Sequence, residues 1–161
     1  MIIGKDDRLF YFGDYECLIN PGFLRQEVLL RRKLNGVQPD PRKAIRDFYR
    51  QLRVCGIKLI IVPVPSKPMI CPEALGGKVA PLQNPSFAEF KKDMWKPTAS
   101  PLSTTSDYAE FRSSGVELFL KTDTHWTIEG MKLAARTQTL WLDAARQNGC
   151  IKAAFAVLLF D

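Results

Sequence analysis

The sequence lacks the features that mark membrane-spanning proteins, secretory precursors and zinc proteins. No apolar run approaches the roughly 18 residues that a membrane helix needs, since the longest, Ala153–Phe160, has eight. The N-terminus does not show the basic, apolar and small-residue segments of a secretory signal peptide. One histidine, and four cysteines without a Cys-x-x-Cys pair, leave too few partners for a metal site. We therefore expect a soluble domain that binds no metal.

The length and composition of the chain are those of one globular domain. A chain of 161 residues, 46% of them apolar and 25% charged, can bury roughly 68–70% of its unfolded surface without a disulfide or a metal. The four cysteines allow three disulfide pairings, and their spacing favours none of them.

The net charge of +6 is concentrated in the first part of the chain. Residues 1–60 carry 12 basic and 7 acidic side chains, whereas residues 61–161 carry 11 and 10. A basic half can bind an anionic polymer, nucleic acid or an anionic lipid surface, but it is also typical of a solvated helix face. No nucleic-acid-binding motif accompanies the charge, so we do not expect nucleic acid as a partner.

Helix and strand patterns alternate along the chain, which predicts an α/β fold. The clearest helix begins at the N-cap Asp40, with Pro41 in its first turn, and ends before Gly56. An apolar stripe lies on one face and a row of arginines on another: Ile45, Phe48, Tyr49 and Leu52, and Arg42, Arg46, Arg50 and Arg53. The next segment, Ile57–Val62, is a nearly continuous β-branched run and predicts a central strand buried on both faces.

Weaker patterns complete this prediction. They indicate strands at Arg8–Phe12 and Val116–Lys121, a turn at Gly13–Asp14, and helices over Phe23–Leu34 and Ile128–Asn148, the last capped by Thr127 and closed by Gly149.

Proline marks a long irregular segment in the middle of the chain. Eight of the eleven prolines lie between Pro63 and Pro101, and we expect a proline-rich loop over residues 66–115. One short helix within it is predicted from Asn84 and Pro85 to about Trp95. Loops of this length in compact domains are functional lids, binding loops or disordered segments.

The single histidine lies in the most informative segment, Lys121–Thr127, between the end of a predicted strand and the start of a predicted helix. Ligands and catalytic groups collect at such positions in open α/β sheets. Asp123 and His125 are two residues apart, so both side chains point to the same side of an extended loop. The carboxylate can then hold the Nδ1–H of the imidazole, which serves as a general base near neutral pH.

An Asp-x-His pair by itself leaves other interpretations open. His125 can be an ordinary surface residue, or Asp123 can cap the following helix with His125 packed beneath it. Trp126 can wall a site or stack on a sugar ring. A metal site is less favoured still, because a single histidine lacks ligand partners.

Three segments together resemble one family. Asp123–Thr127, followed by Gly130 and a helix, resembles the motif of the alginate O-acetyltransferases AlgX and AlgJ, which carry an SGNH hydrolase-like domain. Val62–Lys67 with Cys71–Glu73 resembles the strand and proline-rich loop of that family. Gly4–Phe10 resembles its opening segment, except that Asp7 and Arg8 stand where glycine and tryptophan are usual. The resemblance spans residues 4 to 148.

The resemblance implies a fold, a chemistry and a location. The fold is an SGNH hydrolase-like three-layer sandwich with a mostly parallel sheet, incomplete in this chain. The chemistry is transfer of an acetyl group to a sugar hydroxyl by a Ser-His-Asp triad, with Asp123 orienting His125 and no cofactor. The partners are an anionic polysaccharide or other carbohydrate and an acetyl donor, which can be a protein. The location is the periplasm or the cell envelope.

The nucleophilic serine of the family is missing from its usual place. It follows the Asp/His motif in a Gly-x-Ser-like turn, whereas the last serine of this chain is Ser114. We therefore expect a single domain over residues 1–161 that is truncated at both ends, a fragment of a longer acetyltransferase-like protein. The apolar run Ala153–Phe160 is then either a last strand or out-of-register sequence at a broken end.

Ser66 is the internal candidate for a replacement nucleophile. It follows the central strand and adjoins Lys67, so a Ser66–Lys67 or a Ser66–His125 pairing is conceivable. However, Pro65 and Pro68 flank the pair, and a nucleophile elbow needs small residues at a strained turn. The favoured role of Ser66 and Lys67 is loop structure or the polar lining of a substrate cleft.

Two functions remain open. In the first, the chain is the Asp/His half of a carbohydrate O-acetyltransferase and is inactive alone. In the second, it is a non-catalytic or degenerate family member that holds an anionic glycan with Trp126, Trp95 and the arginine face, of which Arg46 and Arg50 are the candidate contacts.

Overall fold

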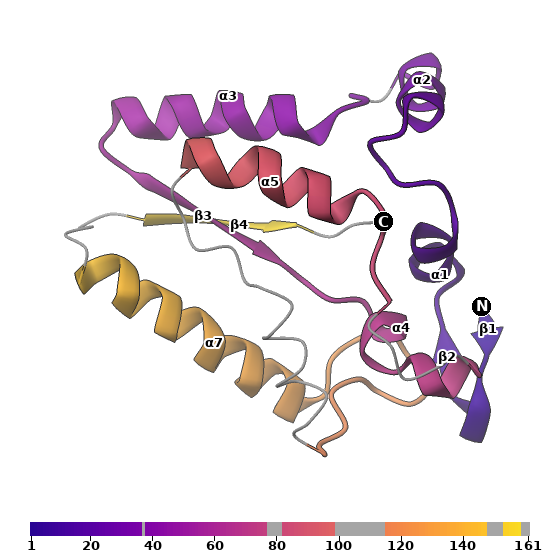
Figure 1. Cartoon of the computed structure of the whole chain (residues 1–161). Coiled ribbons are helices and arrows are strands. Elements are labelled where there is room, and N and C mark those ends of the chain that lie inside the picture. Colours follow the sequence, from indigo (N-terminus) through magenta and orange to yellow (C-terminus); the bar gives the residue numbers. More distant parts are fainter. Residues whose placement is uncertain (37, 77–81, 99–114, 148–152, 159–161) are drawn as a thin grey trace.

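The computed structural model describes residues 1–36, 38–76, 82–98, 115–147 and 153–158 (Figure 1). Its elements, in chain order, are β1 (Ile2–Ile3), the 3-10 helix η1 (Lys5–Asp7), β2 (Leu9–Phe10), α1 (Phe12–Ile19), α2 (Gln26–Leu34), α3 (Pro41–Val54), β3 (Lys58–Pro63), α4 (Lys67–Ile70), the 3-10 helix η2 (Pro72–Leu75), α5 (Phe87–Thr98), α7 (Ile128–Gln147) and β4 (Ala153–Leu158).

The β-branched run forms a buried strand, as predicted. Leu59, Ile60 and Ile61 of β3 are at most 1% exposed, and because neighbouring strand residues point to opposite faces, both faces of β3 are covered. β4 pairs with β3 in parallel, from Lys58 opposite Ala153 to Pro63 opposite Leu158. The apolar run near the C-terminus is therefore a strand of this sheet.

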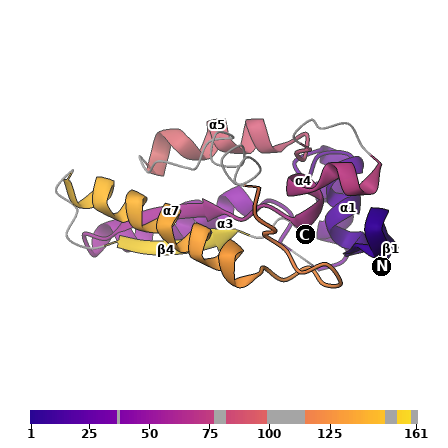
Figure 2. The same ribbon diagram turned by 90° about the horizontal axis from the view of Figure 1, so that it is seen from below.

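Helices lie on both sides of the parallel pair. Figure 1 shows α3 and α5 on one side and α7 on the other, and Figure 2 views the molecule from the α7 side. The main core fills the first interface, between α3, α5 and one face of β3: Phe23, Leu24, Ile45, Leu59, Ile61, Phe87, Phe90 and Met94. The α/β prediction is thus confirmed for the described residues, while a single domain over residues 1–161 stays a prediction.

Local signals fix the ends of α3 as the sequence predicts. Asp40 accepts a hydrogen bond from the backbone N–H of Arg42 at 2.9 Å, and Pro41 occupies the first helical position. Gly56 follows the helix with a φ of 69°, a conformation that glycine adopts without steric cost. Of the predicted apolar stripe, Phe48 alone is largely exposed, at 43%.

Two predictions near the N-terminus need correction, and one in the middle of the chain is extended. The segment predicted as a turn at Gly13–Asp14 lies within helix α1, where the ring of Tyr11 occupies the space that a Cβ of Gly13 would need. α2 begins at Gln26 rather than at Phe23, and the backbone N–H groups of Phe23 and Leu24 donate instead to the side chains of Asn84 and Ser86. Within residues 66–115 the structure adds α4 and η2 to α5, which corresponds to the short helix predicted from Asn84 to about Trp95.

The predicted strand at Val116–Lys121 does not form among the described residues. Phe119 instead makes a single antiparallel bridge to Trp126. The backbone N–H of Leu120 donates to the carbonyl of His125 and that of Thr127 to the carbonyl of Leu118, each at 2.9 Å. Alternation alone did not distinguish this short hairpin from a strand of the main sheet, because both alternate apolar and polar residues.

Candidate active site

The hairpin at residues 118–127 carries the Asp-x-His motif at its turn. The first turn of α7 holds the hairpin from the other side. The hydroxyl of Thr127 accepts a hydrogen bond from the backbone N–H of Gly130 at 3.1 Å and donates to the carbonyl of Glu117 at 2.7 Å. Gly130 packs so closely on Leu118 that a Cβ there would clash with the carbonyl oxygen. Thr127 is therefore the N-cap of α7, as predicted, and Asp123 is not.

Asp123 and His125 are in direct contact. The Nδ1 atom of His125 lies 2.7 Å from Oδ1 of Asp123, which also accepts the backbone N–H groups of Thr124 at 2.5 Å and of His125 at 3.2 Å. A carboxylate only accepts, so this contact assigns a proton to Nδ1 and leaves Nε2 of the neutral ring as the basic atom. The hydrogen bond from His125 lowers the pKa of the Asp123 carboxyl below its ordinary value.

The surroundings of His125 separate the interpretations that the sequence left open. The side chain is 80% exposed, so it is not packed beneath a capping aspartate. It also lines a cavity of about 640 Å³, which an isolated surface histidine would not. The arrangement is therefore an oriented imidazole at the wall of a cavity.

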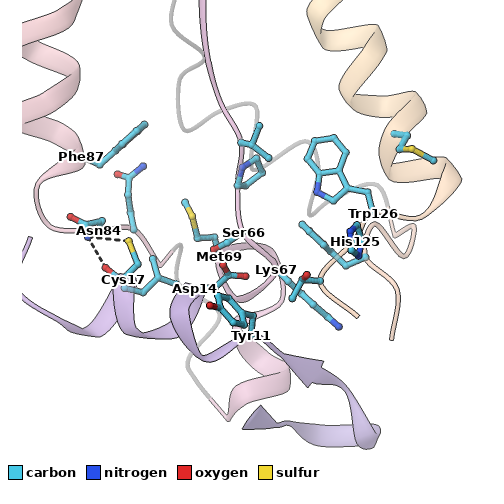
Figure 3. A pocket seen from close by; sticks show the side chains of 17 residues that line it. Tyr11, Asp14, Cys17, Ser66, Lys67, Met69, Asn84, Phe87, His125 and Trp126 are labelled. Atoms are coloured by element: carbon cyan, nitrogen blue, oxygen red, sulfur yellow. Dashed lines mark hydrogen bonds between the residues drawn. The ribbon is translucent and has the colours of Figure 1, made fainter. Parts of the chain in front are cut away.

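The cavity brings together segments that are far apart in the sequence. Figure 3 shows Ser66 between Asp14 and Cys17 of α1 on one side and His125 and Trp126 on the other. The lining residues are Tyr11, Asp14, Cys17, Leu18, Val64, Pro65, Ser66, Lys67, Met69, Gln83, Asn84, Phe87, Phe119, Thr124, His125, Trp126 and Met131. Most of the wall is apolar, and the titratable side chains enter it at a few points.

Trp126 and Ser66 both line the cavity, and their role in substrate binding stays a prediction. Trp126 is half-buried and packs edge-to-face on Phe119, with ring centroids 6.1 Å apart. The hydroxyl of Ser66 makes no hydrogen bond to His125, although both residues are within the described part of the chain. The carbonyl of Ser66 accepts the backbone N–H of Met69 at 3.0 Å and thereby starts α4.

Lys67 has the loop-structure role that the sequence favoured, rather than that of a substrate contact. Its side chain is 1% exposed, and its ammonium donates to the carbonyl oxygens of Leu9, Leu120, Lys121 and Asp123 at 2.6 to 3.0 Å. Burial away from water lowers the pKa of this ammonium below that of an ordinary lysine. With every N–H directed at a carbonyl, Lys67 has no donor left for a substrate and none for activating Ser66.

The arginine row of α3 lies apart from this cavity. Neither Arg46 nor Arg50 is among the described residues that line it. Arg50 pairs with Asp47 at 3.1 Å, and Arg42 pairs with Asp40 at 2.8 Å and with Asp93 of α5 at 2.5 Å. The structure thus separates the predicted glycan contacts on α3 from the Asp123–His125 pair.

Sequence reasoning missed the contribution of α1 to the site. Tyr11, Asp14 and Cys17 line the cavity, and the carbonyl of Cys17 accepts a hydrogen bond from Nδ2 of Asn84 at 2.6 Å. Asp14 is buried, at 9% exposed. The only signal was Asp14 itself, four residues after a short strand, and the neighbouring glycine made it look like part of a turn.

Comparison with known families decides the family of the chain. A family model described as "SGNH hydrolase-like domain, acetyltransferase AlgX" matches residues 22–152. The chain belongs to this family. The resemblance that the motifs indicated is confirmed, and with it the SGNH-like α/β fold.

Individual relatives of the family agree. The chain is 30% identical over 93 residues to the probable alginate O-acetylase AlgJ of Pseudomonas fluorescens, a match that covers 57% of this chain and 24% of that protein. It resembles the solved O-acetyltransferase domain of Pseudomonas putida AlgJ with a TM-score of 0.60 and 21% identity, over 92% of this chain and 48% of that one. The chain thus spans about a quarter of the curated relative and about half of the solved one.

The described residues lack two kinds of feature. They contain no group of three or more histidine, cysteine or acidic side chains placed to hold a metal ion. No helix among them is long and apolar enough to cross a bilayer.

Proposed function

We propose that this domain takes part in the O-acetylation of an anionic polysaccharide of the alginate type, with Asp123 as the orienting carboxylate and His125 as the general base. The observation that carries the proposal is the 2.7 Å contact between Nδ1 of His125 and Oδ1 of Asp123, at the wall of a cavity. The family match supports the chemistry. The reaction would take place in the periplasm or cell envelope, with an acetyl donor that is a partner protein or a small molecule.

The geometry fits acyl transfer through a serine. Nε2 of His125 takes the hydroxyl proton as the serine oxygen attacks the acetyl carbonyl, and returns that proton to the leaving group of the donor when the bond to it breaks. A sugar hydroxyl then attacks the acetyl-serine, again giving its proton to Nε2. Release of the acetylated sugar restores the serine, which recovers its proton from His125. Asp123 stabilises the imidazolium that forms in each half-reaction.

The serine of this scheme is not Ser66 in our proposal. Ser66 makes no hydrogen bond to His125, and the prolines on either side leave no nucleophile elbow. Ser66 and Trp126 would line the acceptor site, with the indole against a sugar ring. The nucleophile would instead be a serine outside the described residues.

We also propose the finer features of the fold. β3 and β4 would belong to a larger, mostly parallel sheet, covered by α3 and α5 on one face and by α7 on the other, as in a three-layer sandwich. Parallel sheets need both faces covered, which the burial of Leu59, Ile60 and Ile61 supports.

A colorimetric ester assay tests the assignment of the nucleophile. We expect the 161-residue chain to release p-nitrophenolate from p-nitrophenyl acetate no faster than its His125→Ala variant, because no hydroxyl of the described residues forms a hydrogen bond with the imidazole. Ser66→Ala is the matched variant at the serine that lines the cavity. Turnover by the unmodified chain that both substitutions abolish would show that Ser66 is the nucleophile after all.

A second candidate function is binding of an anionic glycan without catalysis. Two guanidinium groups of α3 favour it. Arg50 is 75% exposed and pairs with Asp47, while half-buried Arg46 has no ion pair among the described residues. This function predicts that alginate oligosaccharides bind less tightly as salt rises, and that the double variant Arg46→Ala, Arg50→Ala loses binding. Arg136→Ala, an exposed site on α7, is the control. Binding that is insensitive to salt, or that survives in the double variant, would contradict it.

A further inference from the structure

The most unusual polar group of the molecule is a buried ammonium beneath the Asp123–His125 turn. Lys67 begins α4, four residues after β3, and its Nζ lies 2.7 Å from the carbonyl oxygen of Leu9 in β2. The same atom lies 2.6 Å from that of Leu120, 3.0 Å from that of Lys121 and 2.9 Å from that of Asp123. An ammonium has three N–H donors, so these four carbonyls share them and saturate the group.

The four carbonyls come from two separate segments. Leu9 belongs to the N-terminal hairpin of β1 and β2, and the other three belong to the turn that carries the site. The backbone N–H of Leu9 also donates to the carbonyl of Lys121 at 2.9 Å, and the side chain of Arg8 pairs with that of Glu117. Lys67 therefore joins the N-terminal hairpin, α4 and the turn into one unit.

The contact with Asp123 connects this unit to His125. The carbonyl of Asp123 accepts from Lys67, while its carboxylate accepts from Nδ1 of His125 and from the two backbone N–H groups that follow. The ammonium thus fixes the peptide unit whose side chain orients the imidazole. Without it, the carbonyls of Leu9, Leu120 and Asp123 would lose the ammonium as a donor, and that of Lys121 would keep the backbone N–H of Leu9 described above. The turn would then have to rearrange to bring these carbonyls to other donors or to water.

We propose that Lys67 is a positioning residue, which holds the turn of residues 120–123 in the conformation that lets Asp123 orient His125. This inference rests on the proposed roles of Asp123 and His125 and adds a group that touches neither substrate nor imidazole. Its charge faces the carboxylates of Asp123 and Glu117, the thiol of Cys71 and the guanidinium of Arg8, and the ring of Phe10 lies 5.0 Å from Nζ.

The test uses the single histidine as its reporter. Because the chain has one histidine, the ¹⁵N spectrum of the imidazole reports on His125 alone. At alkaline pH, where an ordinary histidine is neutral, we expect the Nδ1–H tautomer to dominate in the wild-type protein. In Lys67→Met, which keeps the length of the side chain and removes its donors, we expect the tautomer ratio to move to that of the protein in urea.

Controls separate positioning from general stability. Lys132→Met removes an exposed lysine of α7 that pairs with Glu129, and it should leave the tautomer ratio at the wild-type value. A folded Lys67→Met variant with the wild-type ratio would overturn the proposal, as would a wild-type ratio equal to that in urea. The tautomer ratio is measured without any enzymatic reaction. Failure of this proposal can therefore be distinguished from failure of the catalytic proposal.

The wild-type protein provides a measurement that does not depend on the folding of a variant. An ammonium bound to four carbonyls away from water should exchange its protons slowly and give a resolved ¹⁵N–H signal, assigned by its proximity to the Phe10 ring. If Lys67→Met does not fold, it is replaced by Lys67→Gln, which keeps two N–H donors. A shifted tautomer ratio in that variant would support the proposal, and the wild-type ratio would overturn it. Absence of any slowly exchanging lysine signal in the wild-type protein would overturn the proposal.

Discussion

Replacing Asp123 by asparagine, or His125 by alanine, should reduce acetyl transfer by the complete natural protein about 10²- to 10⁴-fold, the range that general acid–base catalysis contributes. His125→Ala removes the group that takes the proton from the nucleophile. Asp123→Asn keeps the shape of the side chain but replaces an acceptor with an amide, which can donate to Nδ1 and place the ring proton on Nε2. In that tautomer Nε2 carries a proton and has no lone pair with which to accept the proton of the serine.

The charge of Asp123 matters as well as its shape. The hydrogen bond from His125 holds the pKa of Asp123 below the ordinary value of an aspartate, so the carboxylate stays ionised through neutral and mildly acidic pH. A falling rate at mildly acidic pH would therefore not come from protonation of Asp123. The asparagine variant loses the negative charge at every pH, and its loss of rate should persist across the whole neutral range.

The assay needs the complete protein and a control on the same turn. Reading the coding sequence past Asp161 and measuring the intact mass of the natural protein define what is to be purified. Acetyl transfer to a uronate oligosaccharide is then measured beside thermal unfolding. Thr122→Ala, an exposed residue that does not line the cavity, should keep the wild-type rate. Wild-type transfer by the folded His125→Ala variant would rule out the proposed base.

Phe90→Ala should lower the free energy of unfolding by about 3 to 5 kcal/mol, the usual cost of removing a buried phenyl ring. Phe90 is 0% exposed and lies in the core between α3, α5 and β3. Its ring packs edge-to-face on Phe23, with centroids 5.7 Å apart, and is stacked on Phe87 at 6.4 Å. The substitution leaves a cavity where both rings lose a partner, in addition to the lost burial of the phenyl group itself.

Urea unfolding measures this cost, and Phe48→Ala is the matched control. Phe48 carries the same side chain on α3 but is 43% exposed, so its removal should cost less than about 1 kcal/mol. The melting temperature of Phe90→Ala should fall by roughly 6–20 °C, since each kcal/mol corresponds to about 2–4 °C at this chain length. Equal losses for the two variants would show that Phe90 is not the centre of the core.

Strong local signals predicted the elements that they specify. A proline after an N-cap correctly predicted α3, and a β-branched run correctly predicted β3. A threonine before a periodic apolar segment correctly predicted the start of α7. Each depends on the conformational preference of a few neighbouring residues, so no distant contact was needed. The two elements read wrongly, α1 and the segment at Val116–Lys121, carry signals that suit more than one structure.

The candidate site was predictable only in part, for a similar reason. Asp123 and His125 are two residues apart, so a local turn suffices to bring their side chains together, and the sequence pattern could indicate it. Lys67 was predicted to serve loop structure or to line a substrate cleft, because it adjoins Ser66 just after a strand, but its partners could not be named. Its actual partners, at positions 9 and 120–123, lie more than fifty residues away in either direction.

The sequence by itself determined the family, the buried central strand and the pairing of Asp123 with His125, because motif, propensity and short spacing act within a few residues. Tertiary structure alone decided what surrounds that pair. It placed α1 in the cavity wall, directed the Lys67 ammonium at backbone carbonyls and set the arginines of α3 apart from the site. These outcomes depend on which buried polar groups find partners once distant segments pack, and satisfying those groups is a property of the whole fold.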